Sequence, residues 1–106
     1  MTYGQGNFEQ RHTTMTQITP ANVARLESKW VVQNQVFGAW QSNPIVVDGV
    51  MYITQRPNDV MAIDAKTGSL YWLYRHTPSA DAKVCCGANN RGVAIMGDRV
   101  FMGTLD

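Results

Sequence analysis

The chain has 106 residues, of which 44% are apolar and 16% charged, a composition that allows one small domain with a buried core. Nine lysines and arginines against eight aspartates and glutamates leave a formal net charge of +1, so the chain lacks the basic field that would attract nucleic acid. No apolar run approaches the roughly 20 residues of a membrane span, and the N-terminus lacks the layout of a signal peptide. We therefore expect a soluble protein with no nucleic-acid partner and no membrane span.

The first quarter of the chain contains one predicted helix. Residues 1–16 are polar and show no sustained periodicity, which is typical of an irregular covering segment. In the stretch I-T-P-A-N-V-A-R-L that follows, Thr19 suits the N-cap, Pro20 suits the first helical position, and Val23 and Leu26 fall on one face. We expect a short N-terminal helix of at most two turns.

The centre of the chain carries the signals of β-strands. Residues 30–32 predict a first short strand. The stretch P-I-V-V-D-G-V-M-Y-I-T holds two β-rich runs on either side of Asp48 and Gly49, which predicts a tight hairpin. Residues 60–74 hold two further runs around the turn residues 64–68, which predicts a second hairpin in the same meander.

A long loop follows, and then the first hairpin pattern returns. Residues 76–90 lose all periodicity, and loops of this length are usually functional or disordered. The stretch V-A-I-M-G-D-R-V-F-M then repeats the earlier hairpin around Gly97 and Asp98, at an offset of about 49 residues. A β unit that recurs about every 40–50 residues is typical of propeller blades. We predict an all-β fold of about one and a half blades.

One and a half blades cannot close a propeller. A single blade leaves its sheet faces uncovered, and arrays close only with roughly four to eight blades. We therefore expect residues 1–106 to be an incomplete propeller domain from a longer protein.

The only two cysteines, Cys85 and Cys86, are adjacent in V-C-C-G-A-N-N-R-G. Adjacent Cα atoms lie about 3.8 Å apart, whereas an ordinary disulfide spans roughly 4.4–6.8 Å, so a bond here would close a small, strained ring. Two unlinked thiols are the more common state of such a dipeptide. A shared metal site is disfavoured, because adjacent cysteines chelate poorly compared with C-x-x-C. The dipeptide alone leaves these states open.

Several stretches carry a resemblance to a known family. They are Y-G near the N-terminus, R-H-T-T-M-T-Q-I-T-P-A-N-V-A-R-L-E-S-K-W, and P-I-V-V-D-G-V-M-Y-I-T. Nearly the whole chain resembles the N-terminal part of the quinoprotein alcohol dehydrogenases, such as methanol and ethanol dehydrogenases. Residues 62–72, A-I-D-A-K-T-G-S-L-Y-W, are similar to the family's tryptophan-docking motif, in which the indole packs against a neighbouring blade near an alanine and a Thr-Gly peptide. The resemblance implies an eight-bladed β-propeller that holds pyrroloquinoline quinone and calcium.

The resemblance also implies four cofactor contacts. In the family, a disulfide between adjacent cysteines lies against the quinone, and an arginine five residues further on reaches the cofactor; the matching residues are Cys85, Cys86 and Arg91. A flat cofactor suits a rigid, polarizable platform, and its carboxylates suit a guanidinium. Family members commonly have a glutamate where W-Q-S-N-P has Gln41, whose amide can bond a carboxylate but cannot pair with a cation. The residue after the cysteines, often acidic in the family, is Gly87.

The family's activity follows as an expectation. The resemblance implies a periplasmic enzyme that oxidises small primary alcohols to aldehydes, with calcium as Lewis acid, an aspartate as general base, hydride transfer to the quinone, and a cytochrome c as electron acceptor. The calcium ligands and the catalytic aspartate of the family match no residue up to Asp106. We therefore expect no catalytic or metal-binding residue here, only one wall of the cofactor site, inactive by itself. The oligomeric state stays open, a homodimer included.

Two alternatives differ from this interpretation. A non-catalytic propeller scaffold, similar to the outer-membrane assembly propellers, would share the blades without needing Cys85, Cys86 or Arg91. A propeller enzyme that has lost its cofactor is favoured only by Gln41. Quinone binding by the full-length protein separates these alternatives from the dehydrogenase.

Overall fold

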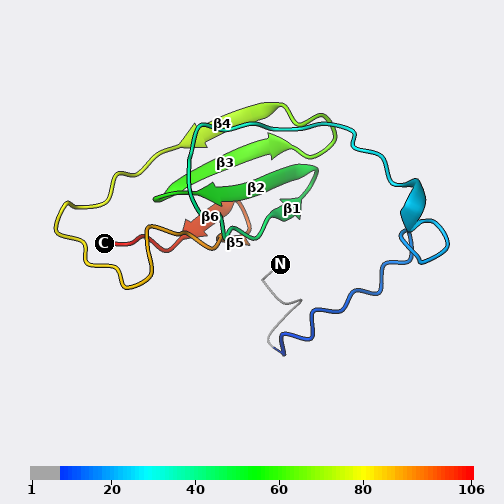
Figure 1. Cartoon of the computed structure of the whole chain (residues 1–106), viewed down its shortest axis with the longest axis horizontal. Helices are drawn as coiled ribbons and strands as arrows, with labels where there is room; N and C mark the ends of the chain where they lie inside the picture. The colour runs from blue at the N-terminus through cyan, green and yellow to red at the C-terminus, as the bar shows by residue number, and fades with distance from the viewer. Residues whose placement is uncertain (1–7) are drawn as a thin grey trace.

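The computed structural model describes residues 8–106, and their regular structure is almost entirely β (Figure 1). One antiparallel sheet holds four strands in chain order: β1 (Ile45–Val47), β2 (Val50–Gln55), β3 (Asp59–Asp64) and β4 (Leu70–Tyr74). A separate hairpin holds β5 (Val93–Met96) and β6 (Arg99–Met102). One four-stranded blade and the start of another are therefore confirmed.

Both hairpins of the predicted repeat turn at glycine. Asp48 and Gly49 have positive φ angles of 49° and 79°, the backbone of a tight turn that pairs Val47 with Val50. Gly97, with φ 60°, opens the corresponding turn between β5 and β6. The repeat seen in the sequence is thus a repeat of structure.

Asp64 closes the turn between β3 and β4. Its Oδ1 accepts hydrogen bonds from the backbone N–H groups of Lys66 (2.7 Å) and Thr67 (3.0 Å), and its Oδ2 accepts one from the Tyr71 hydroxyl (2.9 Å). The Lys66 bond, followed by those of Tyr71 and Thr67, lowers the pKa of Asp64 from its ordinary value of 3.8. The predicted turn-forming role of this aspartate is confirmed.

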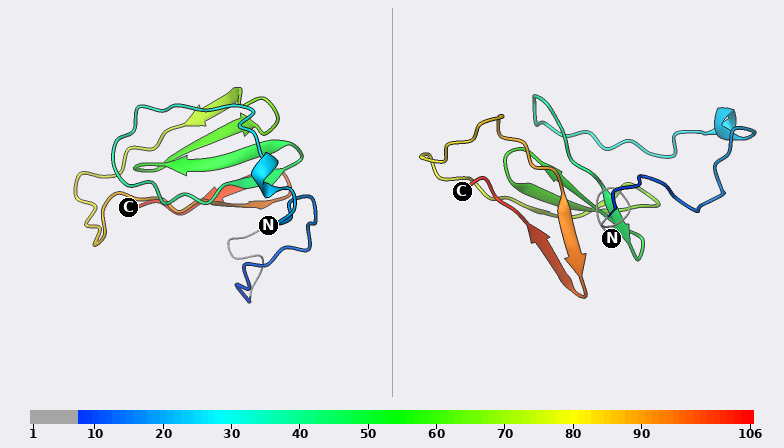
Figure 2. Two further views of the ribbon diagram at one scale, coloured as in Figure 1. Left: turned by 45° about the vertical axis from the view of Figure 1, so that its right-hand side comes forward. Right: turned by 90° about the horizontal axis from the view of Figure 1, so that it is seen from below.

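The core lies between the four-stranded sheet and the β5–β6 hairpin, which crosses one face of the sheet (Figure 2). Ile45, Val60 and Val93 are buried there, one each from β1, β3 and β5. Partly buried apolar side chains surround them, namely Val47, Tyr52, Ile95 and Met102. Burial of this apolar surface holds the second sheet against the first.

Trp72 of the predicted docking motif faces the second sheet. It pairs with Ala62 across β3 and β4, and its ring lies 6.0 Å from that of Tyr52, centroid to centroid. It lines a groove together with Val100 and Met102 of β6. Trp72 remains 42% exposed.

A different tryptophan covers the turn of the motif. The predicted strand at residues 30–32 is wrong, because these residues form no strand. Within residues 8–106, the six strands pair only with one another. A β-rich run becomes a strand only where a partner is available. Trp30 instead donates from Nε1 to the Ala65 carbonyl (3.2 Å), and a Cβ placed on Gly68 would lie 2.8 Å from its ring.

The predicted two-turn helix is also wrong, because only a single 3-10 turn forms, at Val23–Arg25. Asn22 takes the N-cap position in place of Thr19, and its Oδ1 accepts a hydrogen bond from the Thr19 N–H (2.7 Å). Val23 and Leu26 are 48% and 61% exposed, so their apolar face gains little by burial. A short helix without tertiary packing is marginal in water.

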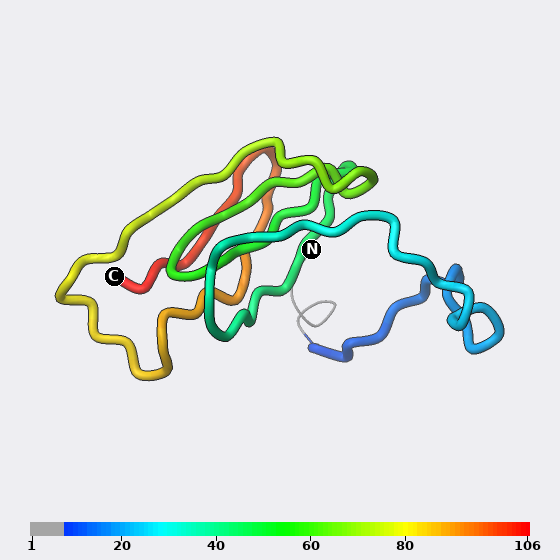
Figure 3. Tube along the Cα trace, turned by 45° about the horizontal axis from the view of Figure 1, so that its top comes forward, coloured from blue at the N-terminus to red at the C-terminus, as the bar shows by residue number. Residues whose placement is uncertain are grey.

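The remaining segments are irregular. The chain between β4 and β5 forms a long loop, as predicted, and its curve encloses the C-terminal end (Figure 3). Residues 8–16 of the predicted covering segment form no helix or strand, and residues 1–7 lie outside the described residues. Within residues 8–106, no helix has the length and apolar character needed to cross a membrane.

We predict that Gly68→Ala destabilises the full-length protein more than Gly49→Ala. Both glycines have positive φ, so each substitution carries a backbone cost of about 1 kcal/mol. Only a Cβ at Gly68 also meets Trp30, which adds about 1–3 kcal/mol of overpacking, whereas a Cβ at Gly49 meets nothing within 4 Å. Thermal unfolding measures both losses, and equal losses would contradict docking of Trp30 on this turn.

We also predict a pH-dependent contribution from Asp64. Because its folded-state pKa is lowered, the carboxylate stabilises the protein above its ordinary value of 3.8, and this contribution is lost as the pH falls through the folded-state pKa. The Tm of the wild type should exceed that of Asp64→Asn by a steady margin between about pH 5 and 8, and the margin should shrink below about pH 4. Asp98→Asn controls for net charge. A margin independent of pH would count against this role.

Candidate cofactor site

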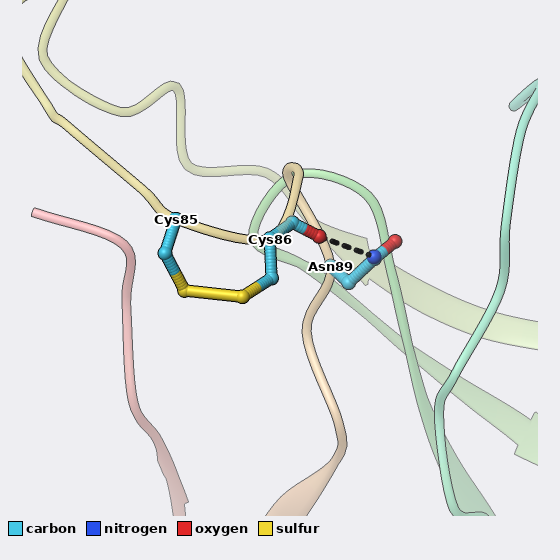
Figure 4. Close-up of a disulfide and its surroundings, with 3 residues drawn as sticks. All are labelled: Cys85, Cys86 and Asn89. Carbon is cyan, nitrogen blue, oxygen red and sulfur yellow. Dashed lines mark hydrogen bonds between the residues drawn. A yellow bond between two sulfur atoms is a disulfide. The ribbon is translucent and has the colours of Figure 1, made fainter.

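Cys85 and Cys86 are joined by a disulfide (Figure 4). Their Cα atoms lie 3.8 Å apart, and both residues are exposed in the loop between β4 and β5. The pairing implied by the resemblance is confirmed, and the alternative of two unlinked thiols is set aside. A shared metal site is set aside as well, because the thiolate is the form of cysteine that binds a metal.

Asn89 holds the turn that follows the disulfide. Its backbone N–H donates to the Gly87 carbonyl (2.9 Å). Its Nδ2 donates to the Cys86 carbonyl (3.3 Å), the bond drawn in Figure 4. Gly87, at φ 84°, supplies the backbone conformation for this reversal. Asn89 Oδ1 is buried and has no hydrogen-bond partner within residues 8–106. A buried acceptor of this kind can accept a hydrogen bond from a ligand.

The four residues predicted to contact a cofactor line one open cavity of about 270 Å³. Gln41 comes from the segment before β1, and Cys85, Cys86 and Arg91 come from the loop before β5. The same cavity is lined by Val84, Gly87, Asn89 and Leu105. The structure therefore brings the four residues together, while their contact with a cofactor stays a prediction.

A second cavity adjoins the first. It has a volume of about 610 Å³ and shares Gln41 and Arg91 with the smaller cavity, to which it adds Glu9 and Asn43. The lining that the two cavities share thus holds one charged group, the Arg91 guanidinium, and the carboxylate of Glu9 lines the larger cavity alone. Position 41, where the family commonly has a glutamate, contributes only an amide.

Two irregular segments form the site, and hydrogen bonds join them directly. We call residues 37–43 the upstream wall and residues 84–92 the disulfide loop. The backbone N–H of Asn43 donates to the Arg91 carbonyl (3.1 Å), and its Nδ2 lies 3.3 Å from the same oxygen. Gly92 permits the close approach, because a Cβ there would lie 3.1 Å from the Asn43 carbonyl oxygen, at a φ of 132°.

Thr54, near the end of β2, lies between the two segments. It is completely buried, at 0% exposure. Its N–H donates to Ser42 Oγ (2.8 Å), and its carbonyl accepts a hydrogen bond from Trp40 Nε1 (2.6 Å). Its hydroxyl lies 2.8 Å from Ser42 Oγ and 3.3 Å from the Asn90 carbonyl. One strand residue thus contacts both the upstream wall and the disulfide loop.

Arg56 makes a second bridge between the same segments. Its Nε donates to the Ala88 carbonyl of the disulfide loop (3.1 Å), and its Nη1 donates to the Phe37 carbonyl of the upstream wall (3.3 Å). The guanidinium lies directly against Gly38, where any side chain would overlap it. The bridge therefore depends on glycine at position 38.

The other end of the long loop is tied to the C-terminal residues. His76 Nε2 lies 3.0 Å from Asp106 Oδ1, and the Ser79 N–H donates to Asp106 Oδ2 (2.9 Å). The Ser79 bond, followed by the His76 bond, lowers the pKa of Asp106 from its ordinary value of 3.8. These contacts hold the segment that carries Leu105 beside the cavity.

Several residues of the site have no signal in the sequence. Thr54 ends an ordinary strand pattern, and Arg56 lies in a turn where a charged side chain is expected to be solvated. Asn89 lies in the V-C-C-G-A-N-N-R-G motif, but the sequence pattern assigns this residue no role. In the described chain, no three His, Cys, Asp or Glu side chains gather as candidate metal ligands.

We predict that Thr54→Val destabilises the full-length protein by about 1–3 kcal/mol, because the change keeps the shape of the side chain but removes its buried hydroxyl. Thr67→Val, at an exposed hydroxyl that bonds Ser69, is the matched control and should cost much less. Chemical denaturation measures both. Equal small losses would contradict a joining role for Thr54.

Comparisons with known proteins identify the family of the chain. The model of the β-propeller domain of glucose, ethanol and alcohol dehydrogenases that use PQQ, pyrroloquinoline quinone, matches residues 1–106. The chain is similar to a quinoprotein ethanol dehydrogenase of Pseudomonas aeruginosa (41% identity, 98% of this chain and 17% of that protein). It is also similar to a 1-butanol dehydrogenase (quinone) of Thauera butanivorans (40% identity, 100% of this chain and 17% of that protein).

A solved structure gives the same result. The chain superimposes on quinohemoprotein alcohol dehydrogenase ADHIIG of Pseudomonas putida HK5 with a TM-score of 0.86 and 38% identity, over 98% of this chain and 16% of that one. The chain thus spans about a sixth of the relatives that it matches. Since the family model extends over the whole sequence, the chain belongs to the PQQ β-propeller family of glucose, ethanol and alcohol dehydrogenases.

Proposed function

We propose that residues 1–106 form part of the propeller domain of a longer, pyrroloquinoline quinone-dependent alcohol dehydrogenase and supply one wall of its cofactor site. The observation that carries this proposal is the shared cavity of Gln41, Cys85, Cys86 and Arg91. The chain's similarity to an ethanol and a 1-butanol dehydrogenase supports small primary alcohols as substrates, with aldehydes as products.

The chemistry of the cavity fits the quinone. The disulfide offers a polarizable surface without ionisable groups for a flat ring system. Arg91 offers paired N–H donors for a carboxylate, and Gln41 adds an amide that can bond the same edge. Asn89 Oδ1 is a buried acceptor that lacks a partner within residues 8–106. The cavity is open on one side, as expected for one wall of a site that further blades would complete.

When bound, the quinone supplies the two-electron acceptor for alcohol oxidation. The residues of this chain bind and orient it: the disulfide covers one face, and Arg91 fixes the position of the carboxylate edge. Calcium and the aspartate that takes the substrate proton belong, in this proposal, to parts of the protein outside residues 1–106. A cytochrome c would accept the electrons.

A periplasmic location completes the proposal. Disulfides persist in oxidising compartments and are rare in the reducing cytosol. The exposed disulfide between Cys85 and Cys86 therefore favours a compartment such as the bacterial periplasm.

We predict calcium-dependent binding of pyrroloquinoline quinone to the full-length protein, and weaker binding in two variants. Arg91→Ala should raise the Kd about 10- to 100-fold, because a charge-assisted hydrogen bond contributes about 1.5–3 kcal/mol. Cys85→Ala/Cys86→Ala should raise it too, because the platform is lost. Titration followed by quinone absorbance or calorimetry gives the Kd values.

Arg25→Ala, on the 3-10 turn, is the matched control and should bind like the wild type. If the intact protein does not bind the quinone, the proposal fails, and a non-catalytic propeller scaffold or an enzyme without its cofactor takes its place. If binding is tight but indifferent to Arg91→Ala and to the cysteine variant, the protein is a quinoprotein whose cofactor lies elsewhere.

A further inference from the structure

We propose that Arg56 is a positioning residue that sets the spacing between the two segments of the cofactor site. One guanidinium holds both segments, through the Ala88 carbonyl of the disulfide loop (3.1 Å) and the Phe37 carbonyl of the upstream wall (3.3 Å). Both acceptors are backbone atoms, so the contact fixes the course of each chain rather than the rotamer of a side chain.

The chemistry of arginine suits this task. The guanidinium is planar and its donors keep fixed relative directions, so two carbonyls that it bonds are held at a fixed separation. A lysine ammonium is a single point with freely rotating donors and cannot impose that separation. Gly38 leaves room for the group, because any side chain there would overlap Nη1.

The backbone of Arg56 is held by the blade. It follows Gln55, the last residue of β2, whose Nε2 donates to Asp59 Oδ2 at the start of β3 (2.9 Å). Gln55, Asn58 and Asp59 around the turn are all buried. The arginine therefore reaches from an ordered strand end into two segments that have no helix or strand of their own.

The position of Arg56 separates its role from that of Arg91. Arg56 lines neither cavity, whereas Arg91 lines both. The upstream wall carries Gln41, and the disulfide loop carries Cys85, Cys86 and Arg91, so a change in spacing moves Gln41 relative to the other three residues. Arg56 therefore acts on the cofactor only through the two segments that it holds. This inference rests on the proposed quinone site.

The test compares Arg56→Met, Arg56→Lys and the matched control Arg25→Met in the full-length protein. Three quantities are measured: the Kd for pyrroloquinoline quinone with calcium, the Tm without quinone, and amide hydrogen exchange without quinone. Arg56→Met should raise the Kd about 10-fold and speed exchange in residues 37–43 and 84–92, with exchange in β2 and β3 unchanged. Arg56→Lys keeps the charge but not the planar guanidinium. Its Kd and its exchange rates should lie between those of Arg56→Met and the wild type.

Two results would overturn the proposal. One is a wild-type Kd and wild-type exchange in Arg56→Met; the other is faster exchange spread evenly over all strands with a large fall in Tm, the signature of a general structural role. If Arg56→Met does not fold, Arg56→Lys decides by the same criteria. If the wild type itself does not bind the quinone, the proposed function fails, and the exchange pattern alone decides the role of Arg56.

Discussion

The burial of Thr54 near the end of β2 is the constraint on which the candidate cofactor site depends. Its N–H, carbonyl and hydroxyl must all find partners away from water, and they find them in Ser42, Trp40 and Asn90. These partners belong to segments far apart in the sequence, one before the blade and one after it. The hydrogen bonds that Thr54 requires therefore bring the upstream wall and the disulfide loop together.

The blade provides the rigid part of this arrangement. Short turns at Asp48–Gly49 and at Asp64 pair the strands in chain order, and the core between the two sheets fixes the hairpin of β5 and β6 behind them. The loop before β5 thus starts and ends on ordered strands. Bonds from Thr54, Arg56 and Asn43 then determine its course between these points, which places the disulfide and Arg91 beside Gln41.

Local signals in the sequence were enough to predict the blade, and the family resemblance was enough to predict the disulfide. Turn chemistry at Asp48–Gly49 and Asp64 acts over a few residues, so it can be seen in the sequence. The predictions of a helix after Thr19 and of a strand at residues 30–32 were wrong, because both elements depend on the residues that pack against them. Trp30 packs on the turn after β3 and has no partner strand. The roles of Thr54 and Arg56 could not be predicted from the sequence, because their hydrogen-bond partners lie at distant positions that only the fold brings close.

The most direct test of this account is a crystal structure of the full-length protein with pyrroloquinoline quinone and calcium. The account predicts a quinone plane that lies against the disulfide of Cys85 and Cys86, with Arg91 and Gln41 at its carboxylate edge and the Thr54 and Arg56 bridges intact behind them. A quinone bound away from this loop, or an upstream wall separated from the disulfide loop around a bound quinone, would contradict it.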